Sequence, residues 1–459
     1  MRLLSFPVPY RADPSVVYSV LYGAEEYAVW LDSGAHAVNG MSLMGAAARR
    51  VSASVADGVV SVDGVRHSGT IFDFLRDDLE QHAVPVGGGF ALGWVGWLGY
   101  ELRAQTMNSE VVRRSRYPDA ALVFLDRGVV FDHATGAATL LALGESWEGG
   151  LLDWRNDVVV RIRQSASGAT GVGTGVATAS DPIVEPTWAC SDEEYLRMIR
   201  DCQTAITAGD AYQLCLTTEA RVDVSPDPLA TYLALRDSSP THHGAFLRMG
   251  DVSVLSASPE QFIAVDPSGE VTTSPIKGTR RRGRTAEEDA RLKDELISSD
   301  KERAENLMIV DLMRNDIGRV SAVGSVGVPS LLTVESYAQV HQLVSTVRGT
   351  LGEGVSGVDA VVACFPAGSM TGAPKRSATE ILDRLEQRAR GIYSGVLGYF
   401  GLDGRIDLSM VIRSIVIDAD GATVGAGGGI TALSVPEEEL DEVHLKAAAL
   451  LRVLGAAVR

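Results

Sequence analysis

The chain has 459 residues, 46% of them hydrophobic, and its 59 acidic and 41 basic side chains give a formal net charge of −18. This length and apolar content fit two or three globular domains and exclude a disordered or fibrous protein. An acidic surface repels phosphate groups, so neither nucleic acid nor an anionic membrane is an expected partner. The longest apolar stretch, Gly87–Tyr100, is too short to span a bilayer, and no secretory signal is visible. We therefore expect a cytoplasmic protein.

The first region, residues 1–164, is predicted to be rich in strands. Apolar runs such as Tyr27–Leu31 and Ala120–Leu125 alternate with Gly and Asp turns. Residues 165–186 include a run of small uncharged side chains that cannot form a packed core, so this segment is predicted to be a flexible linker. The remainder, residues 187–459, forms a second region with strong helical signals.

Helices and strands alternate in this second region. Ser191–Ala208 begins with a capping pattern and is predicted to be an amphipathic helix, followed by a strand over Tyr212–Thr218. The further elements expected, in chain order, are two strands in Val252–Val265, a helical region over Ala286–Asp316 interrupted near Ser298, a helix over Ser377–Arg390, strands over Ser394–Leu402, Leu408–Ile417 and Ala422–Gly425, and a last helix from Pro436. Strand pairs interleaved with helices predict an α+β fold.

Lysine is rare in this chain, since only five of the 41 basic residues are lysines. Lys277 lies in Ser274–Thr279 (SPIKGT), where Pro and Gly predict a tight turn at a strand end. A lysine at such a place is most often a solvated charge, but a fixed backbone also suits a nucleophile at the mouth of a cleft. The cysteines have no metal-ligand spacing and are too few for a disulfide framework, so reduced thiols are expected at Cys190, Cys202, Cys215 and Cys364.

Two pairs of glutamates have a spacing of three residues and share a helix face: Glu302 with Glu305, and Glu439 with Glu442. Lys446 lies on the same face as the second pair. Such pairs usually face solvent, and they could hold Mg²⁺ only if they faced each other across a cleft, which spacing alone does not establish.

Two further segments have unusual composition. Gly425–Ile430 (GAGGGI) matches neither phosphate-binding nor dinucleotide-binding patterns, and it is either a plain turn or a set of unobstructed N–H groups for a carboxylate. The basic run Arg280–Arg284 (RRRGR) could suggest a phosphate site, but in so acidic a chain an exposed loop is expected.

Together these segments resemble the chorismate-utilising enzymes, whose members make anthranilate, aminodeoxychorismate, isochorismate or salicylate. The resemblance is strong over residues 187–459 and weaker before them. It rests on SPIKGT, Lys301–Val320 (KERAENLMIVDLMRNDIGRV), Pro366–Lys375 (PAGSMTGAPK), Tyr393–Phe400 (YSGVLGYF), Met410–Val416 (MVIRSIV) and GAGGGI, and in the first region on Trp30–Ser33 (WLDS) and Trp94–Leu102 (WVGWLGYEL). It implies a layered α/β/β/α fold with packed antiparallel sheets and a central cleft.

The resemblance also implies an activity. The aminodeoxychorismate-forming members have a lysine at the position of Lys277, where other members have alanine. The water-adding members have a lysine base at the position of Gln213, so ammonia is the implied nucleophile here. Lys277 would attack ring carbon C2 of chorismate while Glu260 protonates the departing C4 hydroxyl. Ammonia would then add at C4 and expel the lysine, which transfers an amino group for 4-aminobenzoate and folate synthesis or a related antibiotic pathway.

The resemblance further implies the residues that hold the cofactor and the substrate. Mg²⁺ would be held by Glu305 and Glu442, with Glu302 and Glu439 close by. The implied substrate-binding residues are Arg413, Tyr393, Gly427, Gly428, Gly429, Thr279, Thr371 and Lys446.

Two positions depart from the family pattern. Gln342 takes the place of a usual histidine, and because neighbouring residues of a strand face opposite sides, His341 is not expected to replace it. Ala367 takes the place of a usual glycine. Near Ser33 the resemblance suggests a tryptophan pocket, although a plain strand is an equal alternative.

No glutaminase pattern is found, so the resemblance implies ammonia from a separate glutamine amidotransferase subunit. Anthranilate synthesis is the alternative activity within the family. An alternative of another class is a chorismate-binding regulatory subunit without turnover, for which Gln342 is the motive.

Overall fold

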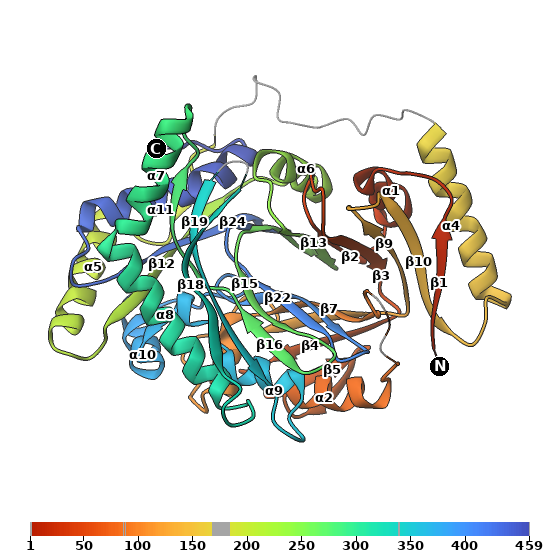
Figure 1. Ribbon diagram of the computed structural model, residues 1–459, viewed down its shortest axis with the longest axis horizontal. Helices are drawn as coiled ribbons and strands as arrows, with labels where there is room; N and C mark the ends of the chain where they lie inside the picture. The colour runs from red at the N-terminus through yellow and green to blue at the C-terminus, as the bar shows by residue number, and fades with distance from the viewer. Residues whose placement is uncertain (1, 86, 88, 168–183, 338–339, 459) are drawn as a thin grey trace.

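The computed structural model describes residues 2–85, 87, 89–167, 184–337 and 340–458. Two large antiparallel sheets form its centre, and helices cover their outer faces (Figure 1). Each sheet contains twelve strands within these described residues. The predicted α+β class with packed antiparallel sheets is confirmed.

The first sheet combines strands from both regions of the sequence. Its order is β1 (Arg2–Val8), β10 (Ala137–Gly144), β9 (Arg127–Asp132), β3 (Met41–Ala46), β2 (Tyr27–Asp32), β13 (His243–Met249), β14 (Val252–Ser258), β23 (Ser414–Asp418), β24 (Gly421–Ile430), β12 (Gln213–Val222) and β11 (Thr187–Trp188), with β20 (Gly372–Ala373) also paired to β12.

The second sheet is built in the same mixed way. Its order is β17 (Ile276–Arg281), β19 (Val340–Thr350), β16 (Glu270–Thr273), β15 (Gln261–Val265), β22 (Ile406–Met410), β21 (Val396–Gly401), β7 (Gly93–Leu98), β8 (Ala120–Leu125), β4 (Arg49–Ser54), β5 (Val59–Val62) and β6 (Val65–Ser68), with β18 (Gly327–Ser336) paired to β19.

The helices lie in two layers. One apolar core joins the outer face of the first sheet to α1 (Pro14–Tyr22), α4 (Gly149–Ser167), α5 (Asp192–Thr207), α6 (Pro228–Ser238), α10 (Lys375–Glu386) and α11 (Pro436–Val453). The other core fills the space between the sheets and continues to α2 (Ile71–Gln81), α8 (Asp300–Gly318) and α9 (Gly357–Cys364). Shorter elements are α3 (Arg103–Thr106), α7 (Ala286–Ser298) and the 3₁₀ turns η1 (Tyr100–Leu102) and η2 (Gly368–Met370). No helix of the described residues combines the length and apolarity needed to cross a membrane.

The two regions on either side of the predicted linker share both sheets. Strand β2 pairs directly with β13, and β7 pairs directly with β21. Of the predicted linker 165–186, α4 extends through Ser167, and residues 168–183 lie outside the described residues. Beyond them, Val184 forms a parallel bridge to Ala456.

Several predicted elements have the expected position. Helix α5 begins with the capping box of Ser191 and Glu194, and its apolar face is buried. The long helical region is interrupted at Ser299, which ends α7 and caps α8. The predicted helix over Ser377–Arg390 ends earlier, at Glu386, because the next residue, Gln387, adopts a left-handed conformation with φ of 51°.

One expected element is wrong in a way that concerns the site, and the structure decides one alternative that the sequence left open. The predicted strand Leu408–Ile417 is divided into β22 and β23, which belong to different sheets. Arg413 lies at this break with a φ of 50°, a left-handed conformation that a continuous strand excludes. The glycine run of GAGGGI is part of strand β24 and not a turn.

Candidate active site

Two strand connections cross side by side from one sheet to the other. One leads from β14 through Glu260 to β15, and the other leads from β22 through Arg413 to β23. Backbone hydrogen bonds hold them together: Met410 N–H donates to the Glu260 carbonyl at 3.0 Å, and Ala257 N–H donates to the Arg413 carbonyl at 3.1 Å. The fold therefore places a carboxylate and a guanidinium at one junction between the sheets.

The side chain of Glu260 lies in a mixed environment. Burial raises the pKa of this carboxyl, while the charges of Lys277 and Lys446 and a hydrogen bond with Ser369 act in the opposite direction. Because burial outweighs these groups, Glu260 keeps its proton to higher pH than an ordinary glutamate. This is the property that a general acid needs.

Lys277 lies in strand β17 and not in the expected tight turn. The pairing of β17 with β19 shifts register between Ile276 and Thr279, so a β-bulge surrounds the lysine. Gly278 follows with a φ of 81°, and a Cβ atom there would come within 3.0 Å of the Glu302 carboxylate. Glycine thus lets α8 approach the strand closely beside Lys277.

The charge of Lys277 reaches carboxylates from three other elements. It lowers the pKa of Glu260 in the β14–β15 connection, of Glu305 on α8 and of Glu442 on α11, against the effect of burial in each case. For Glu442, the nearer ammonium of Lys446, at 2.7 Å, is the stronger influence, and the pKa is lowered overall. For Glu305, burial dominates and the pKa is raised.

The two predicted glutamate pairs do face each other. Glu305 of α8 interacts electrostatically with Glu302 on the same helix and with Glu439 of α11, and Lys301 of α8 donates to Glu439 at 3.1 Å. Glu439 is buried and also accepts a 2.7 Å hydrogen bond from the Ser434 hydroxyl. The spacing of each pair placed it on one helix face, and the packing of the two helices brings the faces together.

The donor set of this cluster fits a divalent cation that prefers oxygen ligands. In the part of the chain that the structure describes, no three acidic, histidine or cysteine side chains are arranged as ligands. Instead, the Lys301 ammonium lies among Glu439, Glu305 and Glu442, which together oppose its desolvation and raise its pKa. The carboxylates therefore already gather around one positive charge.

The amides of the glycine run are not equivalent. The Cys215 N–H donates to Thr371, and the Thr217 N–H donates to Glu386, so neither bonds to its partner on β24. These partners are Gly429 and Gly427, which are therefore members of non-hydrogen-bonded pairs and direct their N–H and C=O groups away from β12. Beyond Val424, β23 no longer pairs with that edge.

Gly427 and Gly429 therefore direct their amides to the open edge of β24, whereas Gly428 pairs with Leu216 in the ladder. Lys446 donates to the Gly427 carbonyl at 2.9 Å on this open side. Of the three glycines predicted to bind substrate, Gly428 therefore has its backbone groups paired within the sheet.

Other glycines of β24 make room for predicted site residues. A Cβ atom at Gly425 would come within 2.2 Å of the Tyr393 ring, and one at Gly429 within 2.3 Å of the Gln213 side-chain amide. Gln213 is 1% exposed, and its side-chain oxygen has no hydrogen-bond partner among the described residues. A buried acceptor without a partner suits a ligand that donates hydrogen bonds.

Arg413 stands near Tyr393 and Glu442, whose charges act on its guanidinium. No hydrogen bond or ion pair of its side chain is found within the described ranges. A guanidinium without a bound carboxylate is available to an anionic ligand.

Three predicted substrate-binding or pocket residues have other surroundings. Thr279 is exposed on β17 opposite Gln342, and the buried Thr371 hydroxyl donates to the Ala367 carbonyl at 3.0 Å. The Ser33 hydroxyl donates to the Met41 carbonyl at 2.9 Å. The hydroxyls of Thr371 and Ser33 are thus already engaged within the protein.

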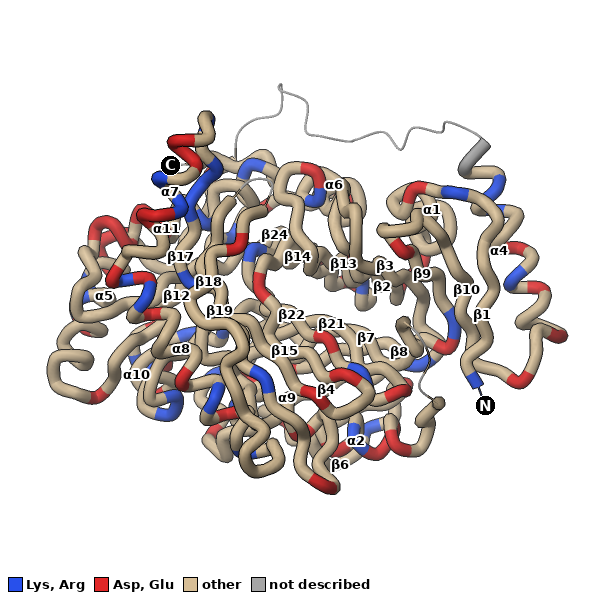
Figure 2. The backbone as a smooth tube through the Cα atoms, in the orientation of Figure 1, with Lys and Arg blue, Asp and Glu red and all other residues tan. Residues whose placement is uncertain are grey.

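The expectation that His341 cannot replace the usual histidine agrees with the structure. His341 is 1% exposed, and its ring nitrogens bond Ser336 at 2.8 Å and Asp289 at 3.0 Å, on the side of α7. In the basic run beside it, Arg281 and Arg282 form ion pairs with Glu288 and Asp289 in the first turns of α7. Figure 2 shows the basic and acidic positions of these two elements in colour. The run is therefore no free phosphate site.

Sequence reasoning missed two residues of this region. Lys301 was noted only as the first residue of the segment Lys301–Val320, yet it links the two glutamate helices. Ser369, which acts on the Glu260 carboxyl, lies inside the PAGSMTGAPK segment, but serine there gave no separate signal.

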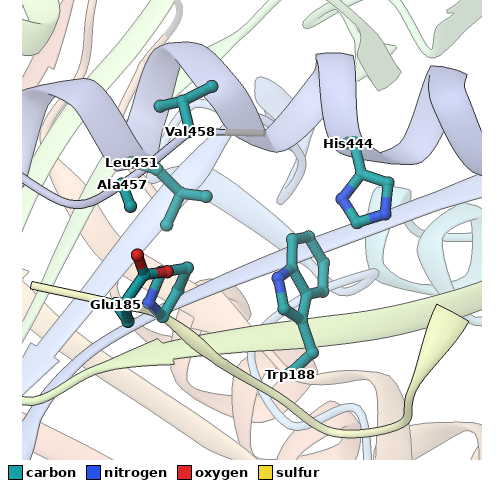
Figure 3. A pocket seen from close by; sticks show the side chains of 7 residues that line it. Glu185, Trp188, His444, Leu451, Ala457 and Val458 are labelled. Carbon is teal, nitrogen blue, oxygen red and sulfur yellow. The ribbon is translucent and has the colours of Figure 1, made fainter.

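A small cavity of about 20 Å³ lies on the other face of α11 (Figure 3). Trp188, His444 and Leu451 are among its lining residues, and His444 is turned about 140° from Glu439 around the helix axis by the 100° advance per residue. It shares no residue with the predicted site. Catalytic candidates and this cavity are separate features of the same helix.

The chain is similar to known proteins over most of its length. The family of chorismate binding enzymes matches residues 26–452. A relative named aminodeoxychorismate synthase, from Streptomyces griseus, is 42% identical over 100% of this chain and 65% of its own length. The chain thus spans slightly less than two thirds of that relative.

Two other similar proteins carry a different name. A relative named anthranilate synthase component 1, from Mycobacterium tuberculosis, is 38% identical over 80% of this chain and 73% of its own length. The solved structure of anthranilate synthase component I from Streptococcus pneumoniae TIGR4 has a TM-score of 0.78 and 26% identity, and the match covers 97% of this chain and 99% of that one. On the breadth of the family match and of these relatives, the chain belongs to the chorismate binding enzymes.

Proposed function

We propose that this protein converts chorismate and ammonia into 4-amino-4-deoxychorismate. The observation that carries the proposal is the position of Lys277, whose charge reaches Glu260, Glu305 and Glu442 from three different elements. A lysine at this position is what distinguishes the aminodeoxychorismate-forming members in the resemblance. A relative that bears the name aminodeoxychorismate synthase supports the same assignment.

The proposed reaction has two displacement steps. The neutral amine of Lys277 forms a bond to ring carbon C2, the two conjugated ring double bonds shift towards C4, and the C4 hydroxyl leaves as water with a proton from Glu260. Ammonia then bonds to C4, the two double bonds shift back, the C2–nitrogen bond to Lys277 breaks, and the surplus proton of the new amine returns to Glu260. The unpartnered Gln213 oxygen provides an acceptor for the N–H groups of the incoming ammonia.

The substrate is a dianion, and the site offers groups for both carboxylates. Arg413 and Tyr393 would bind the enolpyruvyl carboxylate, and the outward amides of Gly427 and Gly429 would receive the ring carboxylate. Glu305 and Glu442, with Glu302 and Glu439 close by, would hold Mg²⁺, which neutralises the ring carboxylate when it is bound.

The ammonia is proposed to come from a separate glutamine amidotransferase subunit that forms a heterodimer with this chain. The product would serve 4-aminobenzoate and folate synthesis or an antibiotic pathway that uses the same intermediate.

One assay tests these statements. The purified protein is incubated with chorismate, Mg²⁺ and an ammonium salt, and the product is identified by mass spectrometry. We expect 4-amino-4-deoxychorismate, no product after EDTA treatment, and no product from glutamine until a cognate amidotransferase is added. Lys277→Ala should lower turnover at least about a hundredfold, as loss of a covalent nucleophile does, while chorismate still binds.

The arms of this assay have opposing outcomes. Full activity of Lys277→Ala would mean direct addition of ammonia without a covalent step. Anthranilate and pyruvate as products would instead support anthranilate synthesis, the second candidate, which the 38% identical relative and the structural match favour. Chorismate that binds but stays unchanged would support a regulatory subunit.

A further inference from the structure

Strand β12 is incompletely paired at the end that faces the site. On one side it pairs with β24 over nine residue pairs, but on the other side β20 covers only Gln213 and Leu214. The backbone groups of Cys215 and Thr217 on that second side therefore need partners from elsewhere, because buried amides and carbonyls are costly to leave unbonded.

The Cys215 N–H donates to the Thr371 carbonyl, and the side chains of Arg390 and Glu386 supply the partners of the Cys215 carbonyl and the Thr217 N–H. Arg390 donates to the Cys215 carbonyl at 2.9 Å, and Glu386 accepts from the Thr217 N–H at 2.9 Å and its hydroxyl at 3.0 Å. The two side chains bond each other at 2.7 and 2.9 Å. They continue the ladder where β20 ends.

Arg390 also holds a second segment of the site. It donates to the Met370 carbonyl at 2.6 Å and to the Ser394 hydroxyl at 3.5 Å, so all five guanidinium N–H groups are used. Met370 ends the 3₁₀ turn η2, in which the preceding residue, Ser369, lies close enough to Glu260 to act on its carboxyl. One buried guanidinium thus joins the turn beside Glu260 to the strand of Gln213.

We propose that Arg390, oriented by Glu386, is a positioning residue that fixes the distance between the turn Gly368–Met370 and strand β12. It thereby fixes Ser369 with Glu260 on one side of the substrate and Gln213 with the Gly427 and Gly429 amides on the other. This inference rests on the proposed function for the roles of Glu260 and Gln213. Arg390 itself bonds only protein groups and is not assigned contact with substrate.

The geometry requires arginine at this position. The planar guanidinium bonds two carbonyls, a hydroxyl and both carboxylate oxygens from fixed directions, whereas a lysine ammonium has three donors on a flexible stem. Arg390→Lys therefore keeps the buried charge beside Glu386 but loses at least two of the five hydrogen bonds.

The experiment compares turnover with chorismate binding in Arg390→Lys. At a temperature where circular dichroism shows a folded protein, kcat with chorismate, Mg²⁺ and ammonium should fall roughly 10- to 100-fold, because small displacements of reacting groups cost this much. The Kd for chorismate, measured by calorimetry, should change less than about threefold, because the Arg413 and glycine contacts remain.

Arg103→Lys is the matched control. Arg103 is also buried and bonds a carboxylate of α10, that of Asp383, at 2.5 and 2.7 Å, and it stacks near the same Tyr100 ring as Arg390. It donates to neither β12 nor the η2 turn within the described residues. This variant should lower the melting temperature but keep kcat within about twofold of the wild type.

The outcomes separate the two proposals. If Arg390→Lys melts at a lower temperature but keeps the wild-type kcat while folded, Arg390 is only structural and the inference is wrong. If Arg390→Lys does not fold, Glu386→Gln is measured in its place. The single amide oxygen of glutamine cannot accept all four hydrogen bonds that the Glu386 carboxylate accepts. An unchanged kcat of Glu386→Gln would also overturn the inference. The wild-type product, identified in parallel, decides the proposed function separately.

Discussion

Glu260 shows how one residue acquires a chemical property from its position. Glu260 lies in the segment SASPEQF, which connects strand β14 of one sheet to strand β15 of the other. This position buries its carboxyl near Lys277 and Lys446. Burial raises its pKa more than the two cations lower it. The protonated form, which can donate to a leaving hydroxyl, is thus kept to higher pH than in an ordinary glutamate.

Turnover should depend on pH through this group. Because the raised pKa keeps Glu260 protonated at low pH, kcat should fall as the pH rises through that pKa. Glu260→Gln should lower kcat by roughly 10²- to 10⁴-fold and remove this alkaline limb of the profile. The control Glu270→Gln, on β16 at a half-exposed site, should retain both the rate and the profile. A Glu260→Gln variant with near-wild-type kcat would exclude this residue as the acid.

At the scale of elements, the N-terminal 3₁₀ turn η1 is joined to the segment after α10 by one buried carboxylate. Glu101 accepts the N–H groups of Arg390 at 2.8 Å and Gly391 at 2.9 Å. Burial is the main cause that raises the pKa of Glu101 from 4.5 to about 7. This carboxylate connects the WVGWLGYEL segment to the backbone of the positioning residue Arg390.

The stability of the protein should therefore fall over a defined pH window. The folded state binds the Glu101 proton more tightly than the unfolded chain, so its contribution is complete below pH 4.5 and is lost as the pH rises through about 7. The loss amounts to about 3 kcal/mol. In urea titrations, the free energy of unfolding of Glu101→Gln should change less between pH 5 and pH 8 than that of the wild type. The difference between the two changes should be on the order of 3 kcal/mol. The control Glu353→Gln, at an exposed position, should show the same pH dependence of the unfolding free energy as the wild type. If Glu101→Gln also showed the wild-type dependence, the Glu101 carboxyl would not be coupled to folding.

For the whole molecule, the charge of −18 does not describe the site. Three of the five lysines, Lys277, Lys301 and Lys446, lie among the cleft carboxylates, and Arg413 stands beside them. Since surface charges are screened over about 8 Å at physiological ionic strength, these near groups govern an anionic substrate more than the distant acidic surface does. The bulk charge favours solubility.

The mixed sheets should make the molecule unfold as one unit. Trp30 of β2 is fully buried and packs against Tyr232 of α6, with 5.4 Å between the ring centroids. In the sequence, Trp30 precedes residues 168–183 and Tyr232 follows them. Trp30→Ala should destabilise the protein by about 3–5 kcal/mol and shift a single calorimetric transition of the whole chain to lower temperature. The control Val38→Ala, at an exposed position, should leave the transition unchanged. Two separate transitions, with only the first shifted, would show that the regions unfold independently.

Much of the local structure was predictable because it depends on near neighbours in the chain. The α5 capping box, the break between α7 and α8 and the buried strand β8 follow from residues within a few positions of one another. The pairs of glutamates were predictable as helix faces for the same reason. The prediction of one strand over Leu408–Ile417 failed because an apolar run carries no signal of the change of sheet at Arg413.

The sequence by itself determined which residues are available for chemistry: the rare lysines, the spaced glutamates and the glycine run in the order of the chorismate binding enzymes. Only the tertiary structure decided their geometry. The facing of α8 and α11 through Lys301, the outward direction of the Gly427 and Gly429 amides, and the junction of β12 and η2 at Arg390 all depend on contacts between residues far apart in the chain. Such contacts are set by strand register and the burial of whole faces, which no local pattern encodes.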